Sequence, residues 1–399
     1  PAFREEIERE TGLSLWVIDG EEEARLSAQG VLLGWPEADG LVCDIGGSSM
    51  ELAVVAGGTV GKRLTSPLGP LKLQGLKGGR KGLKDHISPI MADLVAKMGK
   101  NHKRIYLVGG SWRAIARIDM ERRNYPLHVL HEYRMSSRAV TDTIKFIRKS
   151  NMDELRAKTG TSSARMSLVP IASEVLRQLV HAFHPKEICI SSYGIREGLL
   201  YEQMPEQIRV RDPLIEACRF SEMKDARTPG FGKRLHRFIE PMFRARQYEK
   251  MRIVRAACLL HDVTWRAHPD YRAEVCFDNA TRANLGGLTH SERIFLGLAL
   301  LHRYKNSRDG TPFANLIEML SDKERRDAEV LGKAMRFGAM FAFEAPDELA
   351  KLDYFPKKKV LILTLRPEAE DLFGEVAQAR FQSLASSLGA QAEIKHAKF

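Results

Sequence analysis

Apolar runs that end in glycine-rich turns mark the first half of the chain. The run 41–43 predicts a buried strand, and a second apolar run covers 52–55. Between them, 46–49 reads Gly-Gly-Ser-Ser, so the pattern predicts a β-hairpin whose tip is mostly backbone. Glycines at such a tip let backbone N–H groups converge on an anion, although a simple tight turn has the same pattern. Two acids, Asp44 and Glu51, flank the tip, and one or both could hold a divalent cation against bound phosphates.

Helix and strand patterns alternate through the rest of the first 205 residues. A strand at 104–108 runs into Gly109, Gly110 and Ser111 and then into a helix. This order predicts an anion site at the helix N-terminus. Further helices are expected at 1–12, 21–33, 85–98, 137–150, 164–182 and 194–201, and further strands at 15–18, 59–65 and 188–191.

The second half of the chain has a different pattern. Composition shifts near 202–213, which predicts a linker, and the following residues are almost entirely helical in periodicity. The last stretch predicts a strand at 357–365, a helix at 367–388 and a short strand after Gly389. We therefore expect three units, covering residues 1–205, 206–345 and 346–399.

Composition is that of a soluble globular protein. The 399 residues are 44% hydrophobic and 28% charged. Apolar runs stay well below the ~20 residues that cross a membrane, and the first residues are charged and helical. The five cysteines show no C-x-x-C spacing, which is typical of reduced core residues. We expect a cytoplasmic protein with no membrane partner.

Positive charge is concentrated in one region of this basic chain, whose net charge is +11. Between Lys62 and Arg104 eleven Lys and Arg face two acids, and a glycine-rich loop within this region carries four of them: Lys77, Arg80, Lys81 and Lys84. Such a loop suits a polyanion through counterion release, and the alternative is a solvated basic surface. Because no aromatic residues interleave these cations, we expect no nucleic-acid partner and a ligand that is mostly phosphate.

Several motifs, in the order in which they follow one another along the chain, resemble those of the exopolyphosphatase / guanosine pentaphosphate phosphohydrolase family. The segment 20–25 matches its G-x-E-E-A-R run, and 44–51 matches its D-I-G-G-G-S-T-E loop, with Ser48 and Met50 as departures. The segments IYLVGGSWRAI at 105–115 and SYGIREGLLY at 192–201 extend the resemblance over the first 205 residues. It implies the α/β actin-like ATPase (ribonuclease H-like) fold.

The resemblance also implies a chemistry and its residues. It assigns the activation of a water molecule to Glu23, with Mg²⁺ held by Asp44 and Glu51. The backbone amides of the two glycine turns would hold phosphates: Gly46, Gly47, Ser48, Ser49, Gly109, Gly110 and Ser111. For any one of the three glutamates at 21–23, the alternative is a charge that merely suits a helix N-terminus.

The chain begins at Pro1 in the middle of an amphipathic helix pattern. The family begins with another phosphate loop, of the form D-x-G-S-x-x-x-R, which this sequence does not contain. We therefore expect a further N-terminal portion before Pro1, and a first lobe that is incomplete here.

In the helical stretch, His236 and the pair His261-Asp262 resemble the ligands of metal-dependent HD phosphohydrolases. Ala339 stands where that architecture needs a further aspartate, and alanine cannot bind a metal. We expect a helical HD-like domain whose metal site is degenerate.

The preferred interpretation is a Mg²⁺-dependent exopolyphosphatase that releases orthophosphate from inorganic polyphosphate, as a homodimer. Guanosine pentaphosphate is the alternative substrate within the same family. A sugar kinase or ATP-driven chaperone on the same fold is a second class, which the glutamate run disfavours. A protein that binds polyphosphate or an alarmone without catalysis is a third.

Overall fold

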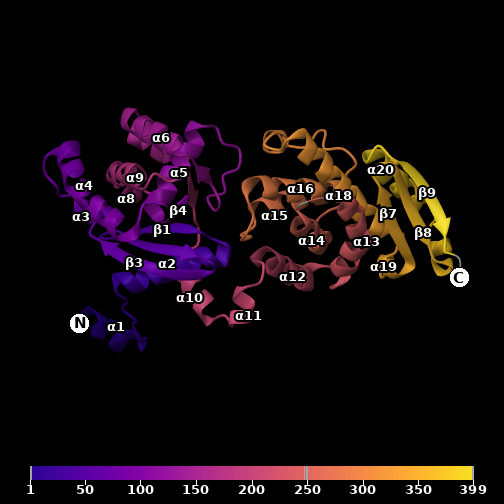
Figure 1. The fold of residues 1–399 in the computed structure, drawn as a ribbon, viewed down its shortest axis with the longest axis horizontal. Coiled ribbons are helices and arrows are strands. Elements are labelled where there is room, and N and C mark those ends of the chain that lie inside the picture. Colours follow the sequence, from indigo (N-terminus) through magenta and orange to yellow (C-terminus); the bar gives the residue numbers. More distant parts are fainter. Residues whose placement is uncertain (1, 247, 249, 398–399) are drawn as a thin grey trace. The chain divides into compact units, whose positions relative to one another are not determined.

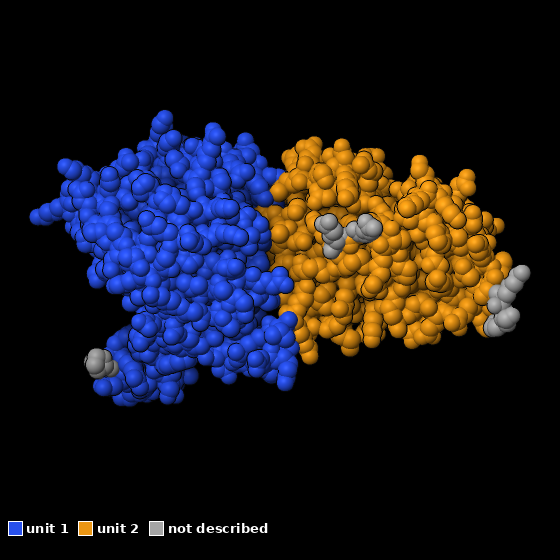
Figure 2. All heavy atoms as spheres, in the orientation of Figure 1, with its two compact units in different colours: residues 1–210 blue, residues 211–399 orange. Residues whose placement is uncertain are grey.

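The computed structural model describes residues 2–246, 248 and 250–397. The chain divides into two units, residues 1–210 and residues 211–399 (Figure 2). Each has its own strands and helices, and each is described below by itself.

A six-stranded mixed sheet is the centre of the first unit (Figure 1). Its strands are β1 (Gly40–Ile45), β2 (Met50–Ala56), β3 (Thr59–Ser66), β4 (Arg104–Val108), β5 (Arg134–Met135) and β6 (Glu187–Ile190). They lie in the order β3-β2-β1-β4-β6-β5. The first three form an antiparallel meander, and β1, β4 and β6 run parallel to one another. The parallel strands therefore end at one edge of the sheet, where both glycine turns begin.

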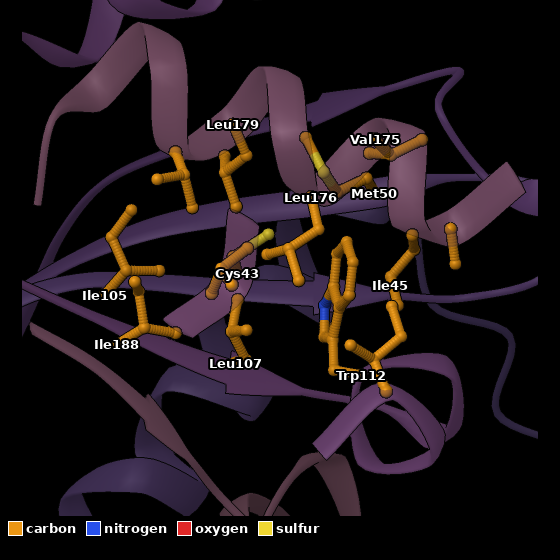
Figure 3. Close-up of a cluster of buried hydrophobic side chains, with 14 of the residues drawn as sticks. Cys43, Ile45, Met50, Ile105, Leu107, Trp112, Val175, Leu176, Leu179 and Ile188 are labelled. Carbon is orange, nitrogen blue, oxygen red and sulfur yellow. The ribbon is translucent and has the colours of Figure 1, made fainter. Parts of the chain in front are cut away.

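The helices of the first unit cover the two faces of this sheet unequally. They are α1 (Ala2–Thr11), α2 (Gly20–Gly34), α3 (Pro70–Leu73), α4 (Gly79–Met98), α5 (Gly110–Arg122), α6 (Ser137–Lys149), α7 (Met152–Thr159), α8 (Ser163–Met166), α9 (Val169–Phe183), α10 (Ile195–Gln203) and α11 (Glu206–Arg209). Alternate strand residues such as Cys43 and Leu107 pack with Trp112 and Leu176 in the larger core, which α4, α5, α6 and α9 cover (Figure 3). The opposite residues, such as Val42, pack against α2 in a smaller core.

Glycines allow α2 and α10 to lie in close contact. A Cβ atom added to Gly198 would lie 1.8 Å from the carbonyl oxygen of Leu26, and one added to Gly30 would lie 2.2 Å from that of Gly194. Both neighbours are backbone atoms, which cannot move aside as a flexible side chain would. The close packing fixes α2, and with it the glutamate run, on one face of the sheet.

The second unit joins a helical bundle to a three-stranded sheet. Its helices are α12 (Pro213–Asp225), α13 (Phe231–Ala245), α14 (Met251–Leu260), α15 (Arg272–Arg282), α16 (His290–Tyr304), α17 (Ala314–Ile317), α18 (Asp322–Phe341), α19 (Pro346–Leu349), η1 (Pro367–Leu372) and α20 (Glu375–Ser387). The strands β7 (Ala350–Phe355), β8 (Val360–Leu365) and β9 (Gln391–His396) lie in that order. The rings of Phe337 on α18 and Phe381 on α20 are 5.3 Å apart, so residues 346–399 share a core with the bundle rather than standing as a third unit.

Several predicted elements differ from the observed ones. Residues 12–19 carry no regular structure, so the strand predicted at 15–18 is wrong. The helix predicted at 85–98 begins earlier, at Gly79, which places three of the four loop cations in its first two turns. The helix predicted at 164–182 is broken between α8 and α9, and that predicted at 367–388 is a 3₁₀ helix followed by α20. Among the described helices, none is long and apolar enough to cross a membrane.

Candidate active site

Asp44 and Glu51 are direct cross-strand partners on β1 and β2. Because side chains alternate between the faces of a sheet, both lie on the face that α2 covers, together with Val42 and Ala53. Both are buried, with exposed fractions of 6% and 1%. The hydroxyl of Ser27 on α2 donates a hydrogen bond to Asp44 Oδ2, and that of Thr65 donates to Glu51 Oε1 at 3.0 Å. Two carboxylates that follow each other around a hairpin are thus brought together under a helix.

The glutamate run opens α2, and its three members have different environments. Asp19 caps the helix by accepting a hydrogen bond from the Glu22 amide at 2.8 Å. Glu21 is exposed, and Glu22 is held by the guanidinium of Arg25 at 2.6 Å. Glu23 is half-buried, and its pKa is raised first by that burial and then by the charge of the nearby Asp44 carboxylate. Of the three, Glu23 is therefore the one that lies beside the buried carboxylates.

Burial makes all three carboxyl groups harder to ionise, and neighbouring negative charge adds to this at Glu23 and Glu51. Burial raises the pKa of Glu51 to about 7, and the charges of Glu23 and Asp44 contribute to that increase. Burial also raises the pKa of Glu23 and that of Asp44, although the Ser27 hydrogen bond and the Arg113 charge oppose the increase at Asp44. Oε2 of Glu51 is buried without a hydrogen-bond partner in the described part of the chain. The cluster is thus suited to a bound cation.

The donor atoms of the cluster suit a cation that keeps part of its own hydration shell. Within residues 2–246, 248 and 250–397, no three His, Cys, Asp or Glu side chains converge closely enough to form a full protein cage for a metal ion. Mg²⁺ is usually bound by one or two carboxylates, with waters and substrate phosphates completing its shell. Asp44 and Glu51, with the unpartnered oxygen of Glu51, fit that mode of binding.

The first glycine turn joins β1 to β2. Its Gly46 amide donates to the Ser49 carbonyl at 3.1 Å, and the Leu71 amide donates to the Gly47 carbonyl at 2.8 Å. The carbonyls of Gly47 and Ser48 therefore accept hydrogen bonds from the start of α3, where Gly69 donates to the Ser48 carbonyl at 3.3 Å. Between the two strands, the amides of Gly47, Ser48 and Ser49 have no backbone acceptor in the described chain. These three amides remain for an anion, whereas the amide of Gly46, which the sequence also predicts to hold phosphate, already donates to Ser49.

The second glycine turn lies beside the first because Asp44 pairs with Val108 in the parallel register of β1 and β4. Gly109 has a φ of +113°, and a Cβ atom there would lie 2.6 Å from the carbonyl oxygen of Ile45. Trp112 is fully buried in the larger core and fixes the first turn of α5 on the sheet (Figure 3). The N-terminus of α5 thus opens at the edge that carries Asp44.

The structure also places the cations of the basic loop and the HD-like residues. Lys77, Arg80, Lys81 and Lys84 are all exposed, and Arg80 lies 3.8 Å from Glu174. In the second unit, Asp262 receives two hydrogen bonds from the guanidinium of Arg227, at 2.6 and 2.7 Å. The polyanion track and the degenerate HD-like site remain predictions.

Sequence reasoning missed a group of arginines next to the second glycine turn. Arg113 and Arg117 lie on α5, one helical turn apart, and they share a pocket with residues from two other segments: Arg165 and Arg196. The only sequence signal was the i, i+4 spacing of the first pair, because the other two are brought there by the fold.

Comparisons with known proteins identify the family. The model of the Ppx/GppA phosphatase family matches residues 2–207, and the model described as exopolyphosphatase, C-terminal, matches residues 223–395. A curated relative, retrograde regulation protein 2 of Saccharomyces cerevisiae, is 24% identical over 322 residues, which are 74% of this chain and 54% of that protein. The chain thus spans about half the length of this relative.

Solved structures of similar proteins include one from Cytophaga hutchinsonii and one from Aquifex aeolicus. An exopolyphosphatase from Cytophaga hutchinsonii matches with a TM-score of 0.46 and 20% identity, over 50% of this chain and 68% of that chain. The type II variant of the Aquifex aeolicus Ppx/GppA phosphatase matches with a TM-score of 0.43 and 21% identity, over 51% and 70%. The mixed sheet, the two glycine turns and the family models that together cover most of the sequence lead to one conclusion: the chain belongs to the Ppx/GppA phosphatase family, with its actin-like ATPase fold followed by a helical C-terminal part.

Proposed function

We propose that the protein hydrolyses the terminal phosphoanhydride bond of inorganic polyphosphate, with water as the acceptor and orthophosphate as the product. The observation that carries this proposal is the convergence of Glu23, Asp44 and Glu51 beside two backbone turns that present amides. Phosphoryl transfer needs positioning and electrostatic stabilisation more than covalent chemistry, and this arrangement offers both.

In this mechanism Glu23 orients the attacking water and accepts its proton. A raised pKa makes its carboxylate a stronger base near neutral pH than an exposed glutamate. The amides of Gly47, Ser48 and Ser49 hold the terminal phosphate, and the N-terminus of α5 stabilises negative charge on the phosphate beside it. Asp44 and Glu51 would hold Mg²⁺, which when bound supplies positive charge to the phosphate oxygens.

The first experiment compares hydrolysis and binding in Glu23→Gln. The amide keeps the shape of the side chain but cannot accept a proton, so phosphate release should fall by about 10²-fold or more. Polyphosphate retention in a filter-binding assay should stay close to that of the wild type. Glu22→Gln is the matched control, because its carboxylate is held by Arg25 and should be dispensable for turnover.

The outcomes separate the alternatives. Near-normal turnover in Glu23→Gln would remove Glu23 from its role. Phosphate release from guanosine pentaphosphate in preference to polyphosphate would identify the other substrate of the family. Binding of polyphosphate without any release, in the presence of Mg²⁺, would indicate a binding protein instead of an enzyme.

A further inference from the structure

A small pocket in the first unit gathers positive charge without any acid. It has a volume of about 240 Å³, and its lining consists of four arginines, two hydroxyl residues and two apolar residues: Arg113, Arg117, Arg165, Arg196, Thr161, Ser192, Ala114 and Leu130. The lining comes from α5 and the loop after it, from residues 161–165 at the start of α8, and from the first turn of α10 with the residue Ser192 before it. The fold therefore assembles the cluster from distant parts of the sequence.

None of these four guanidinium groups has a carboxylate oxygen within 4.0 Å in the described part of the chain. Other arginines of this unit are paired, as Arg25 is with Glu22 and Arg134 is with Glu132. Within the cluster, Arg113 is half-buried, and burial together with the charges of Arg165, Arg117 and Arg196 lowers its pKa. The repulsion between these cations would be relieved by a bound anion.

The pocket is next to the candidate active site. A Cβ atom added to Gly110 would lie 2.7 Å from Nε of Arg165 and 2.9 Å from its Cζ. A Cβ atom added to Gly109 would lie 3.1 Å from Oδ1 of Asp44. The glycine turn thus has the Asp44 carboxylate on one side and the Arg165 guanidinium on the other. A ligand that contacts the turn's amides can reach both.

The lining restricts what the anion can be. Guanidinium groups bind phosphate oxygens through two parallel hydrogen bonds. No aromatic residue lines the pocket, so a nucleobase would have nothing to stack on. The volume is also smaller than the roughly 300–1,000 Å³ of sites for larger organic ligands. These features favour a short ligand that consists of phosphate alone.

We propose that this arginine pocket binds a short inorganic phosphoanion, pyrophosphate or orthophosphate, beside the hydrolytic carboxylates. The inference deepens the proposed function, since it gives the products of the reaction a place next to the site that forms them. It does not depend on turnover, because binding of the anion can be measured directly.

The test is calorimetric titration of inorganic pyrophosphate into the full chain, with a chelator present to remove divalent cations. Saturable binding is expected, weakened at least tenfold in Arg117→Ala and in Arg165→Ala, and less in Arg165→Lys, which keeps the charge but loses the paired donors. Arg138→Ala is the matched control: it removes the same charge from an exposed residue of α6 that does not line the pocket, and should leave binding unchanged. Circular dichroism of each variant verifies that it is folded.

Three outcomes would overturn the proposal. Unchanged affinity in both Arg117→Ala and Arg165→Ala would place the anion elsewhere. Equal affinity for sulfate would mean an adventitious ion only. Tighter binding of a guanosine polyphosphate, lost in the same variants, would mean a nucleotide site. If pyrophosphate binds as expected but polyphosphate is not hydrolysed, the pocket stands and the proposed function fails.

Discussion

At the residue scale, the buried carboxyl of Glu51 makes the stability of the protein depend on pH. Its pKa is about 7 in the folded protein and near 4.5 when unfolded. The folded state therefore holds a proton that the unfolded state has lost, and the free energy of unfolding falls as pH rises from about 4.5 through 7. One pKa unit corresponds to about 1.4 kcal/mol, so the loss from this group is on the order of 3 kcal/mol.

Replacing Glu51 by Gln should remove that loss. We expect Glu51→Gln to be more stable than the wild type by about 1–3 kcal/mol at pH 8.5 and nearly equal to it at pH 5, in urea unfolding without Mg²⁺. Glu37→Gln, at an exposed position of the same unit, is the control and should show no such pH-dependent difference. If the stability difference between Glu51→Gln and the wild type were the same at pH 5 and pH 8.5, the raised pKa of Glu51 would be contradicted.

The sequence predicts which residues lie together only where the contacts between them are local. The spacing in the hairpin was enough to place Asp44 and Glu51 together, because cross-strand pairing is a short-range property. The family resemblance singled out Glu23, and the structure adds the physical distinction that Glu22 is held by Arg25. The arginine pocket could not be predicted, because its members are brought together by packing across many residues.

At the scale of elements, the contact between α2 and α10 positions the site. In Gly198→Ala the new Cβ atom would lie 1.8 Å from the carbonyl oxygen of Leu26, so one helix must move. We expect the free energy of unfolding to fall by roughly 3 kcal/mol, at the upper end for overpacked positions. Because α2 carries Glu23, phosphate release should fall as well.

Gly75→Ala is the matched control for that substitution. A Cβ atom at Gly75 meets nothing within 4 Å, so its effect should stay within about 0.5 kcal/mol. The free energy of unfolding in urea and the rate of phosphate release are measured for both variants. A Gly198→Ala protein as stable as Gly75→Ala would mean that the helices tolerate separation.

Elements with a clear period and a recognisable end were predicted well. The apolar run at 41–43 lies within β1 (Gly40–Ile45), and the strand at 104–108 and the helix after Gly109 are where the pattern places them. The strand at 15–18 was predicted from apolar content alone, yet a strand also needs a partner, and residues 12–19 pair with none in the described structure. The early start of α4 was missed because glycines there were interpreted as a loop.

At the scale of the whole molecule, the second unit should hold no transition metal. Both oxygens of Asp262 are bound by Arg227, and Tyr304 also donates a hydrogen bond to Oδ1 at 3.3 Å. Burial lowers the pKa of His261 to about 3, so this histidine is neutral at physiological pH, but it lacks an available acidic partner. Elemental analysis of purified protein should find less than a tenth of an equivalent of Fe, Mn or Zn, on the order expected of contamination. A full equivalent that is lost in His261→Ala would show the opposite.

The charge of the whole first unit leads to a prediction about long polyphosphate. If Lys77, Arg80, Lys81 and Lys84 each neutralise one phosphate, their joint replacement by alanine should reduce the slope of log affinity against log salt by roughly 3. The loss should be larger for long chains than for short ones, because the two glycine turns can hold only the terminal phosphates.

A second quadruple variant controls for net charge. It replaces four other exposed residues by alanine: Lys97, Lys100, Lys103 and Arg138. The first three lie at or beyond the far end of α4, and a helix of 20 residues is about 30 Å long, so they are well separated from the proposed track. Equal changes of slope in the two variants would mean that long chains respond to overall charge rather than to a track at the start of α4.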